Sequence, residues 1–140
     1  MRILNVGCGP VIPGVTPGIE MLNIDRRAHE GATIADMENL PYADGEFDLV
    51  VCINALDHTQ NAELALHELI RVSNKWVYID CALIQKTTSG RGHYADVLEN
   101  GDVTDNRLMN FNFKDYGFEI EFIDNGMERR YNHVIARLTK

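Results

Sequence analysis

The segment RILNVGCGPVIPGVTPGIEMLNID, residues 2–25, decides how the rest of this chain is interpreted. An aliphatic run over residues 3–6 leads into a Gly-x-Gly turn at Gly7 and Gly9, and a second apolar run ends at Asp25. A strand, a glycine turn and a second strand that ends in a carboxylate are typical of a nucleotide site, where the carboxylate holds ribose hydroxyls. The segment therefore predicts an α/β protein with a site for a nucleoside-containing ligand.

The residues after the glycine turn argue against a ligand that contains pyrophosphate. Dinucleotide folds bind pyrophosphate with the N–H groups at the start of a helix that follows the turn. Pro10, Pro13 and Pro17 interrupt that helix here, and proline has no N–H to donate. The fingerprint's third glycine is also replaced, by Ile12. S-adenosylmethionine carries adenine, ribose and a sulfonium amino acid but no phosphate, so the segment favours it over NAD.

Composition sets the class of protein and excludes several partners. A length of 140 residues predicts a single domain over residues 1–140, and 45% apolar with 24% charged residues is ordinary for a globular protein. There is no apolar run of membrane-spanning length and no signal-peptide pattern after Met1, and three cysteines without metal-type spacing suggest reduced thiols. We therefore expect a cytoplasmic location and no membrane association. A formal net charge of −8 without a long basic cluster argues against nucleic acid.

Seven apolar runs indicate the strands of one sheet. They cover residues 3–6, 20–24, 32–35, 47–53, 76–82, 118–123 and 133–138. The nearly continuous runs 47–53 and 76–79 suit strands buried on both faces of a parallel sheet, whereas 118–122 alternates as an edge strand does. Only about six residues separate the second and third runs, which is short for a parallel crossover, so the third strand should be brief.

Helices are expected to be few, particularly in the N-terminal half. Residues 61–73 place apolar side chains on one stripe, and Thr59 or Asn61 can cap that helix. A second helix is predicted over residues 104–116, ended by Gly117. One sheet face near the first strands should then be thinly covered, which a second copy of the chain could correct as a homodimer.

The connection over residues 84–104 is long for a compact domain, which indicates a lid, a substrate-binding loop or disorder. Residues 96–103 read either as a small hairpin around Asn100-Gly101 or as an irregular excursion. His93 and Tyr94 lie in this connection and are candidates to reach a substrate.

An ordered set of motifs resembles the class I S-adenosylmethionine-dependent methyltransferases. The matching stretches are LNVGCG (4–9), NID (23–25), ADMENLPY (35–42), DGEFDLV (44–50), LDHT (56–59) and ALHELIRV (65–72). The resemblance covers roughly residues 2 to 81 in the order and spacing of the family. It implies a Rossmann-like seven-stranded sheet, mostly parallel with an antiparallel last strand, and methyl transfer from S-adenosylmethionine to an acceptor.

The resemblance also implies roles for individual residues, with S-adenosylhomocysteine as the product that leaves. Its cofactor-binding positions fall on Gly7, Cys8, Gly9, Asp25, Asp36, Met37 and Asn54. Asp25 would accept hydrogen bonds from the ribose hydroxyls, and Asp36 would accept one from the adenine amino group. Asn54 would lie near the amino end of the cofactor. Several features depart from the family: Asn5 replaces the usual acidic residue, the Pro/Gly loop replaces the helix after the glycine turn, and Ser73-Asn74-Lys75 replaces the usual Lys-Pro-Gly-Gly turn before the fifth strand.

His58 and Asp57 are the candidate catalytic residues. A histidine near neutral pKa suits a general base at the end of a strand, and Asp57 could orient it; the alternative is a structural histidine bonded to nearby backbone. The five histidines show no metal-ligand spacing, so no metal is expected. Two other functions stay open: a cofactor-binding module or partner subunit without its own catalysis, and a different nucleotide enzyme that uses NAD. The net charge favours a small-molecule acceptor, which the sequence does not identify.

Overall fold

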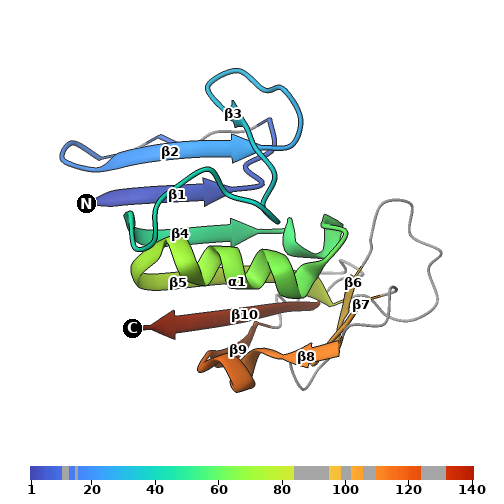
Figure 1. Cartoon of the computed structure of the whole chain (residues 1–140). Helices are drawn as coiled ribbons and strands as arrows, with labels where there is room; N and C mark the ends of the chain where they lie inside the picture. Colours follow the sequence, from blue (N-terminus) through green and yellow to red (C-terminus); the bar gives the residue numbers. More distant parts are fainter. Residues whose placement is uncertain (11–12, 15, 84–94, 99–101, 106–109, 124–131) are drawn as a thin grey trace.

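The computed structural model describes residues 1–10, 13–14, 16–83, 95–98, 102–105, 110–123 and 132–140. Its main sheet has seven strands in the order β3-β2-β1-β4-β5-β10-β9 (Figure 1). Their bounds are β1 Arg2–Val6, β2 Glu20–Asp25, β3 Thr33–Ile34, β4 Phe47–Ile53, β5 Ser73–Leu83, β9 Glu119–Ile123 and β10 Asn132–Thr139. Strands β1 to β5 pair in parallel, whereas β10 is antiparallel to both of its neighbours, β5 and β9. The predicted Rossmann-like sheet with an antiparallel last strand is confirmed.

Each of the seven predicted runs overlaps one strand of this sheet. The expected brief third strand is β3, only two residues long, and the alternating run over 118–122 is the edge strand β9. Glu119 and Glu121 are exposed on either side of the half-buried Ile120, and both carboxylates pair with Arg137 of β10 at 2.9 Å. Charges on an edge strand hinder pairing with other chains, so this edge is protected from aggregation.

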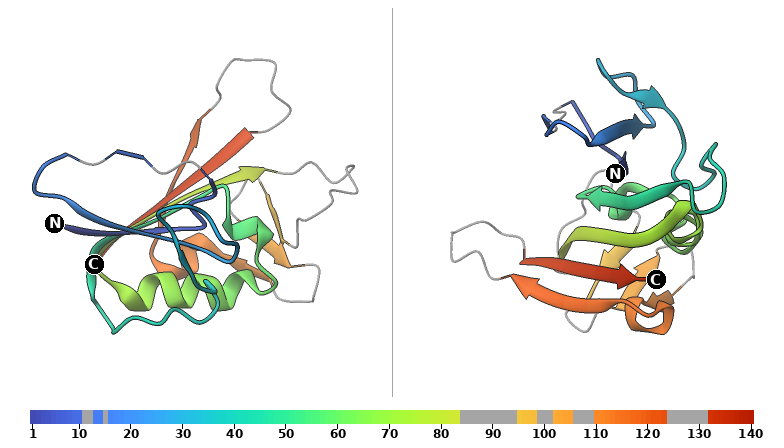
Figure 2. Two further views of the ribbon diagram at one scale, coloured as in Figure 1. Left: turned by 90° about the horizontal axis from the view of Figure 1, so that it is seen from above. Right: turned by 90° about the vertical axis from the view of Figure 1, so that its left-hand side faces the viewer.

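Helix α1 (Ala62–Val72) packs on one face of the sheet and forms the core with it (Figure 2). Its buried stripe is Ala62, Ala65, Leu66, Leu69 and Val72. Facing it, the register aligns fully buried aliphatic side chains of neighbouring strands, among them Leu4, Val50 and Val77. The helix prediction is confirmed, and its cap is Asn61, whose side chain accepts a hydrogen bond from the N–H of Leu64 at 2.9 Å.

The opposite face of the sheet carries no α-helix within the described part of the chain (Figure 2). The strand register places Met21, Ile3, Leu49 and Trp76 side by side on that face. Two of the connections that could supply helices there, β1–β2 and β2–β3, have none among their described residues. The expected scarcity of helices in the N-terminal half is therefore confirmed, and an apolar row lies on the face away from α1.

The predicted helix over residues 104–116 is wrong. The structure has strands β7 (Asp102–Asp105) and β8 (Asn110–Asn112), which with β6 (Ala95–Val97) form a second, three-stranded sheet. Val103 pairs with Phe111 across β7 and β8, and both side chains are buried. Asn112 also bonds locally, accepting from the N–H of Lys114, and asparagine favours such side-chain caps over helix interiors. Strand pairing and capping therefore outweigh the weak helical pattern.

Two finer expectations for this region are confirmed. Strands β6 and β7 pair antiparallel, with Val97 opposite Val103, so of the two alternatives for residues 96–103 the hairpin holds in the described strands, whereas its turn at Asn100-Gly101 lies outside the described residues. Gly117 has a φ of 84° and ends the short 3-10 helix η2 (Phe113–Tyr116). The remainder of the predicted lid or substrate loop, residues 84–94 and 99–101, lies outside the described residues, as do His93 and Tyr94.

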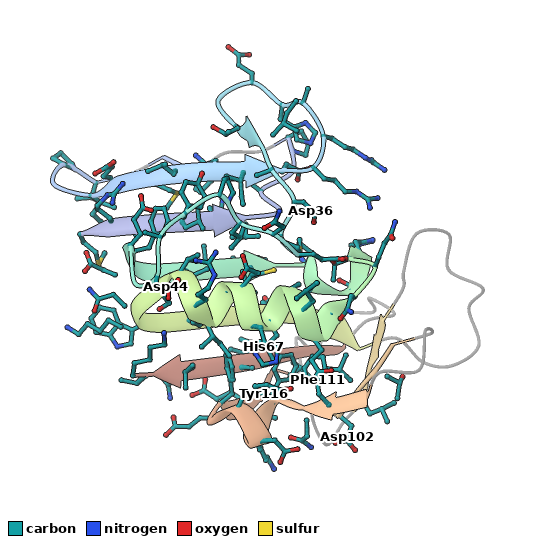
Figure 3. All side chains as sticks on the ribbon, viewed as in Figure 1. Asp36, Asp44, His67, Asp102, Phe111 and Tyr116 are labelled. Carbon is teal, nitrogen blue, oxygen red and sulfur yellow. The ribbon has the colours of Figure 1, made fainter. Side chains whose placement is uncertain are left out.

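An aromatic cluster attaches this second sheet to α1 (Figure 3). The ring of Tyr116 contacts the rings of Phe111 and His67 edge-on, with centroids 5.7 and 5.3 Å away. The Tyr116 hydroxyl donates to Glu63 at 2.5 Å, and burial together with this bond raises the pKa of Tyr116 to about 12. His67, although exposed on α1, thus packs its ring against Tyr116.

Candidate functional site

A cavity of about 910 Å³ opens at the carboxyl ends of β1, β2 and β4. This is the edge at which ligands bind in open α/β sheets. The lining residues are Val6, Gly7, Gly9, Pro10, Ile24, Asp25, Arg26, Arg27, His29, Ile34, Ala35, Asp36, Met37, Glu38, Asn54, Ala55, His58, Thr59 and Gln60. Four separate segments of the chain therefore meet around one space.

The glycine turn brings the backbone of β1 close to the loop after β4. Gly7 has a φ of 70°, and a Cβ atom placed on it would lie 2.3 Å from the Cβ of Ala55. The N–H groups of Gly7 and Cys8 both donate to the carbonyl of Ile24, at 2.9 and 3.1 Å. Glycine at position 7 thus permits a close contact with Ala55 that a side chain would block. The approach of this backbone to a ligand stays a prediction.

Asp25 is held in place by backbone donors on both of its carboxylate oxygens. Oδ2 accepts from the N–H of Gly9 at 3.0 Å, and Oδ1 accepts from the N–H of Arg27 at 2.9 Å. His29 Nε2 lies 3.7 Å from Oδ1. An ionised carboxylate has about four acceptor sites, so both oxygens retain capacity for hydroxyl donors such as those of a ribose.

Asp36 and Met37 form the wall that follows β3. Asp36 begins a tight turn, in which its Oδ1 accepts from the N–H of Glu38 at 2.9 Å and its carbonyl from the N–H of Asn39 at 3.1 Å. The N–H of Ala35 donates to the carbonyl of Asp25 at 3.0 Å, which joins this wall to the end of β2. The turn presents a carboxylate and an apolar side chain to the same cavity, a combination suited to a flat, partly polar ring.

Asn54 and the short 3-10 helix η1 (Leu56–His58) form the opposite wall. Asn54 has a φ of 51° and donates its N–H to the carbonyl of Asp80 at 2.7 Å. Asparagine is one of the few residues with a side chain that adopts this left-handed conformation readily. The chain therefore turns sharply at the end of β4, and the following residues pass along the cavity.

The two candidate catalytic residues occupy different environments. The side chain of His58 is 42% exposed and lines the cavity, whereas that of Asp57 is 1% exposed and lies behind it. His58 Nε2 and Asp57 Oδ2 are 3.8 Å apart, within ion-pair range but beyond a hydrogen bond. The negative charge of Asp57 acts on a second neighbour, Cys52: burial raises the pKa of the Cys52 thiol to about 12, and the charge of Asp57 adds to this rise. Asp57 can influence His58 electrostatically in this arrangement.

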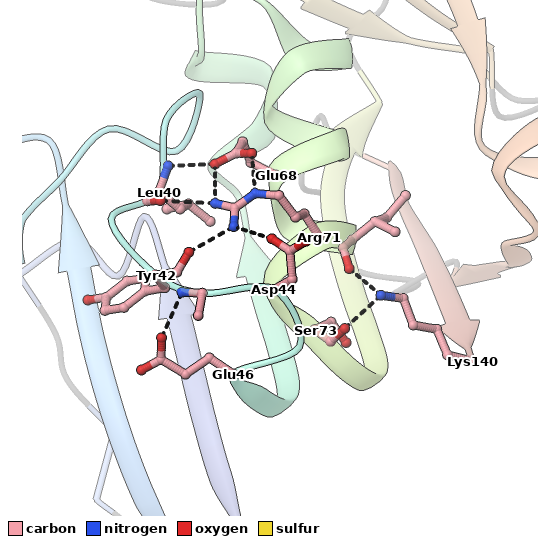
Figure 4. A network of polar contacts seen from close by, with 10 residues as sticks. Leu40, Tyr42, Asp44, Glu46, Glu68, Arg71, Ser73 and Lys140 are labelled. Carbon is pink, nitrogen blue, oxygen red and sulfur yellow. Dashed lines mark hydrogen bonds and ion pairs between the residues drawn. The ribbon is translucent and has the colours of Figure 1, made fainter.

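An arginine clamp fixes the strap that we define as residues 36–44, between β3 and β4, onto α1 (Figure 4). Arg71 donates to the carbonyls of Leu40 and Tyr42 at 3.0 and 2.8 Å, and to Asp44 at 2.8 Å. Glu68 accepts from Arg71 at 2.6 Å and from the N–H of Leu40 at 2.8 Å, and the bond from Arg71 lowers the pKa of Glu68. The clamp holds the far end of the segment that carries Asp36 and Met37.

The structure brings most of the predicted site residues together. Gly7, Gly9, Asp25, Asp36, Met37, Asn54 and His58 all line the cavity. Cys8 and Asp57 are not among the lining residues, and Asn5 instead donates to Asn23 at 2.9 Å within the sheet.

Sequence reasoning missed His29 and the link that Glu38 makes. The four-residue spacing of His29 from Asp25 is the one sequence signal that could have identified His29 as a site residue. The bond from Thr59 Oγ1 to Glu38 joins residues 21 positions apart and leaves no local pattern. Among the described residues no group of three or more metal-ligating side chains occurs, and none of the described helices has the length and apolar character to cross a bilayer.

Comparison with known proteins gives one family and several similar folds. Residues 4–76, just over half of the chain, match the family described as "Methyltransferase domain". Norajmaline N-methyltransferase of Rauvolfia serpentina is 48% identical over 40 residues, which are 29% of this chain and 14% of that enzyme. The matched part is thus a small fraction of the curated relative.

Two solved structures share the fold at low sequence identity. The [4+2]-cyclase SpnF superposes with a TM-score of 0.67 at 15% identity, over 99% of this chain and 74% of that one. The 1,6-didemethyltoxoflavin-N1-methyltransferase of Burkholderia thailandensis, with 1,6-didemethyltoxoflavin and S-adenosylhomocysteine bound, has a TM-score of 0.64 at 8% identity, over 99% of this chain and 70% of that one. These likenesses establish the fold alone.

Proposed function

Since the chain belongs to the methyltransferase-domain family, the class I S-adenosylmethionine-dependent methyltransferases, we propose that it moves a methyl group from S-adenosylmethionine to a small-molecule acceptor. The observation that carries this proposal is the carboxylate of Asp25, held by the N–H groups of Gly9 and Arg27 at the edge of the cavity. A carboxylate oriented in this way suits the two neighbouring hydroxyls of a ribose.

The donor set of the cavity fits this cofactor from end to end. Asp25 would hold the ribose, Asp36 and Met37 the adenine, and the Gly7 to Gly9 backbone with Asn54 the amino acid portion. Cys8 would contribute through its backbone. The prolines after the turn remove N–H donors that a pyrophosphate would need, and the cofactor proposed here has no phosphate.

The reaction would depend chiefly on positioning. When bound, the cofactor would supply a methyl group on a sulfonium, which an oxygen, nitrogen or carbon of the acceptor would take in line as S-adenosylhomocysteine leaves. The chain's own contribution is to orient the two molecules and exclude water. His58 faces the cavity and would accept the acceptor's proton where the nucleophile carries one, with Asp57 stabilising the imidazolium from behind.

A small acceptor is favoured by charge and by a relative. The net charge of −8 repels polyanions, and the curated relative named above methylates norajmaline, a small molecule. The alternative is a domain that binds the cofactor without methyl transfer. It is motivated by the similar fold of SpnF, which is named for a cyclisation, because one fold supports several chemistries.

Calorimetric titration with S-adenosylhomocysteine tests the proposal. Wild-type protein should bind, Asp25→Ala should abolish binding, and Asp115→Ala is the matched control, since Asp115 is an exposed aspartate of η2 outside both the cavity and the arginine clamp. Wild-type binding without turnover of S-adenosylmethionine against a panel of small amines, phenols and carboxylic acids would favour the binding module. Lack of any binding, or binding of NADH in its place, would contradict the proposal.

We further propose that a second copy of the chain covers the sheet face opposite α1, in a cytoplasmic homodimer. The half-buried Met21, Leu49 and Trp76 of the apolar row support the dimer, together with Ile53, which lies on the same face and is 46% exposed. The three free thiols support a reducing compartment. Ile53→Lys should convert a dimer to a monomer in light scattering, whereas Leu64→Lys, at a residue 44% exposed on α1, should not. A monomeric wild-type protein would contradict the dimer.

A further inference from the structure

Glu38 joins the two walls of the cavity. Its Oε1 accepts from the hydroxyl of Thr59 at 2.5 Å and from the N–H of Asn61 at 2.8 Å. Thr59 follows η1 on one wall, whereas Glu38 lies in the strap on the other, and both residues line the cavity. The Glu38 carboxylate therefore connects the wall that carries Asp36 to the wall that carries His58.

The strap needs such a fastening because backbone pairing holds it weakly. Strand β3 has only two residues, paired to β2 alone, and the sheet ends there. The arginine clamp fixes the strap at residues 40–44, beyond the cavity. Nearer the cavity, the side chain of Glu38 links the strap to the start of α1 by accepting from the N–H of Asn61. The helix dipole also favours a negative charge at this end of α1.

The position of Glu38 also determines the orientation of Asp36. The N–H of Glu38 donates to Asp36 Oδ1 at 2.9 Å, so moving Glu38 moves the carboxylate that faces the cavity. Thr59 is 6% exposed, and its N–H donates to the carbonyl of Leu56 at 3.3 Å, so the partner of Glu38 is anchored in η1.

From these contacts we propose that Glu38 is a positioning residue, which through Thr59 sets the adenine wall of the cavity relative to the wall that carries His58. The inference rests on the proposed function, since it assigns the adenine of the cofactor to Asp36 and Met37. The Glu38–Thr59 bond couples the two ends of the site: a ligand that orders one wall orders the other.

Four variants test the proposal with S-adenosylhomocysteine as the probe in calorimetry. Thr59→Val, which removes the hydroxyl at nearly constant volume, should weaken binding about tenfold, because a bond to a charged acceptor is lost. Thr59→Ser should bind as wild type does. Glu38→Ala should weaken binding at least as much, whereas Glu63→Gln, at a first-turn carboxylate of α1 outside the cavity, should leave binding unchanged.

The double variant Glu38→Ala/Thr59→Val tests whether Thr59 acts on ligand binding through Glu38 or whether each residue contributes to binding independently. If Thr59 acts through Glu38, the double variant should bind no more weakly than Glu38→Ala alone. Multiplied losses, or wild-type affinity in Thr59→Val, would overturn the proposal.

Amide hydrogen exchange of the ligand-free protein gives a readout that does not depend on the cofactor. The N–H groups of Glu38 and Asn39 both bond to Asp36, so they should exchange faster in Thr59→Val and at the wild-type rate in Thr59→Ser. Unchanged exchange in Thr59→Val would overturn the positioning role even if the cofactor binds. Faster exchange in a protein that binds no S-adenosylhomocysteine would retain the structural link and remove the proposed function.

Discussion

Replacing Gly7 by alanine should destabilise the protein by two separable effects. The φ of 70° at Gly7 costs a residue with a Cβ roughly 1–2 kcal/mol. The new Cβ would also lie 2.3 Å from the Cβ of Ala55, well inside van der Waals contact, and relieving such overpacking costs about 1–3 kcal/mol. The expected loss of unfolding free energy is therefore about 2–5 kcal/mol, a large part of the ordinary stability of a small domain.

Gly9→Ala is the matched control. Gly9 has nearly the same backbone conformation, with a φ of 62°, but a Cβ placed there meets no atom within 4 Å. Its loss should be only the conformational part, about 1–2 kcal/mol. Urea unfolding followed by circular dichroism measures both losses as shifts of the midpoint at constant slope.

Ala55→Gly supplies the decisive third variant. In the Gly7→Ala background it removes the clashing methyl group, so the double variant should be more stable than the sum of the two single losses by about 1–3 kcal/mol. Equal losses for Gly7→Ala and Gly9→Ala, or additive losses with Ala55→Gly, would refute the argument from close approach.

Arg71→Met should lower stability by about 1–3 kcal/mol, because two strap carbonyls and the Glu68 carboxylate lose their donor. Arg71 lowers the folded-state pKa of Glu68, so the Glu68 part of this stabilisation is present above the ordinary value of 4.5 and is lost as the pH falls through the lower folded-state pKa. The bonds to the two carbonyls do not titrate, so the urea midpoints of the two proteins should approach each other in acid without coinciding, and a constant difference would contradict the contribution of Glu68. A thiol-specific disulfide reagent at pH 8 should react with Cys8, which is half-buried, in the folded protein, and with Cys52 and Cys81 only after unfolding, because both inner thiols are fully buried. Simultaneous reaction of all three thiols would show that the inner pair is accessible.

The elements whose residues show a clear local pattern of apolar and polar side chains could be predicted from the sequence. Continuous apolar runs mark the buried strands β4 and β5, alternation marks the edge strand β9, and the stripe and cap over residues 61–73 mark α1. The helix expected over residues 104–116 failed because the local pattern there was weak. Pairing of Val103 with Phe111, and the aromatic contacts of Tyr116 with α1, decide that region through residues distant in the sequence.

The site divides in the same way. By itself the sequence determined the order of the motifs along the chain, the position of the glycine turn, and the place of the Asp25 carboxylate at a strand end. Each of these depends on residues that are adjacent in the chain. Only the tertiary structure decided that Asp57 lies behind the cavity while His58 faces it, and that Glu38 reaches Thr59. Burial and contacts across 21 residues depend on how the elements pack against one another, and packing is a property of the whole chain rather than of any one stretch.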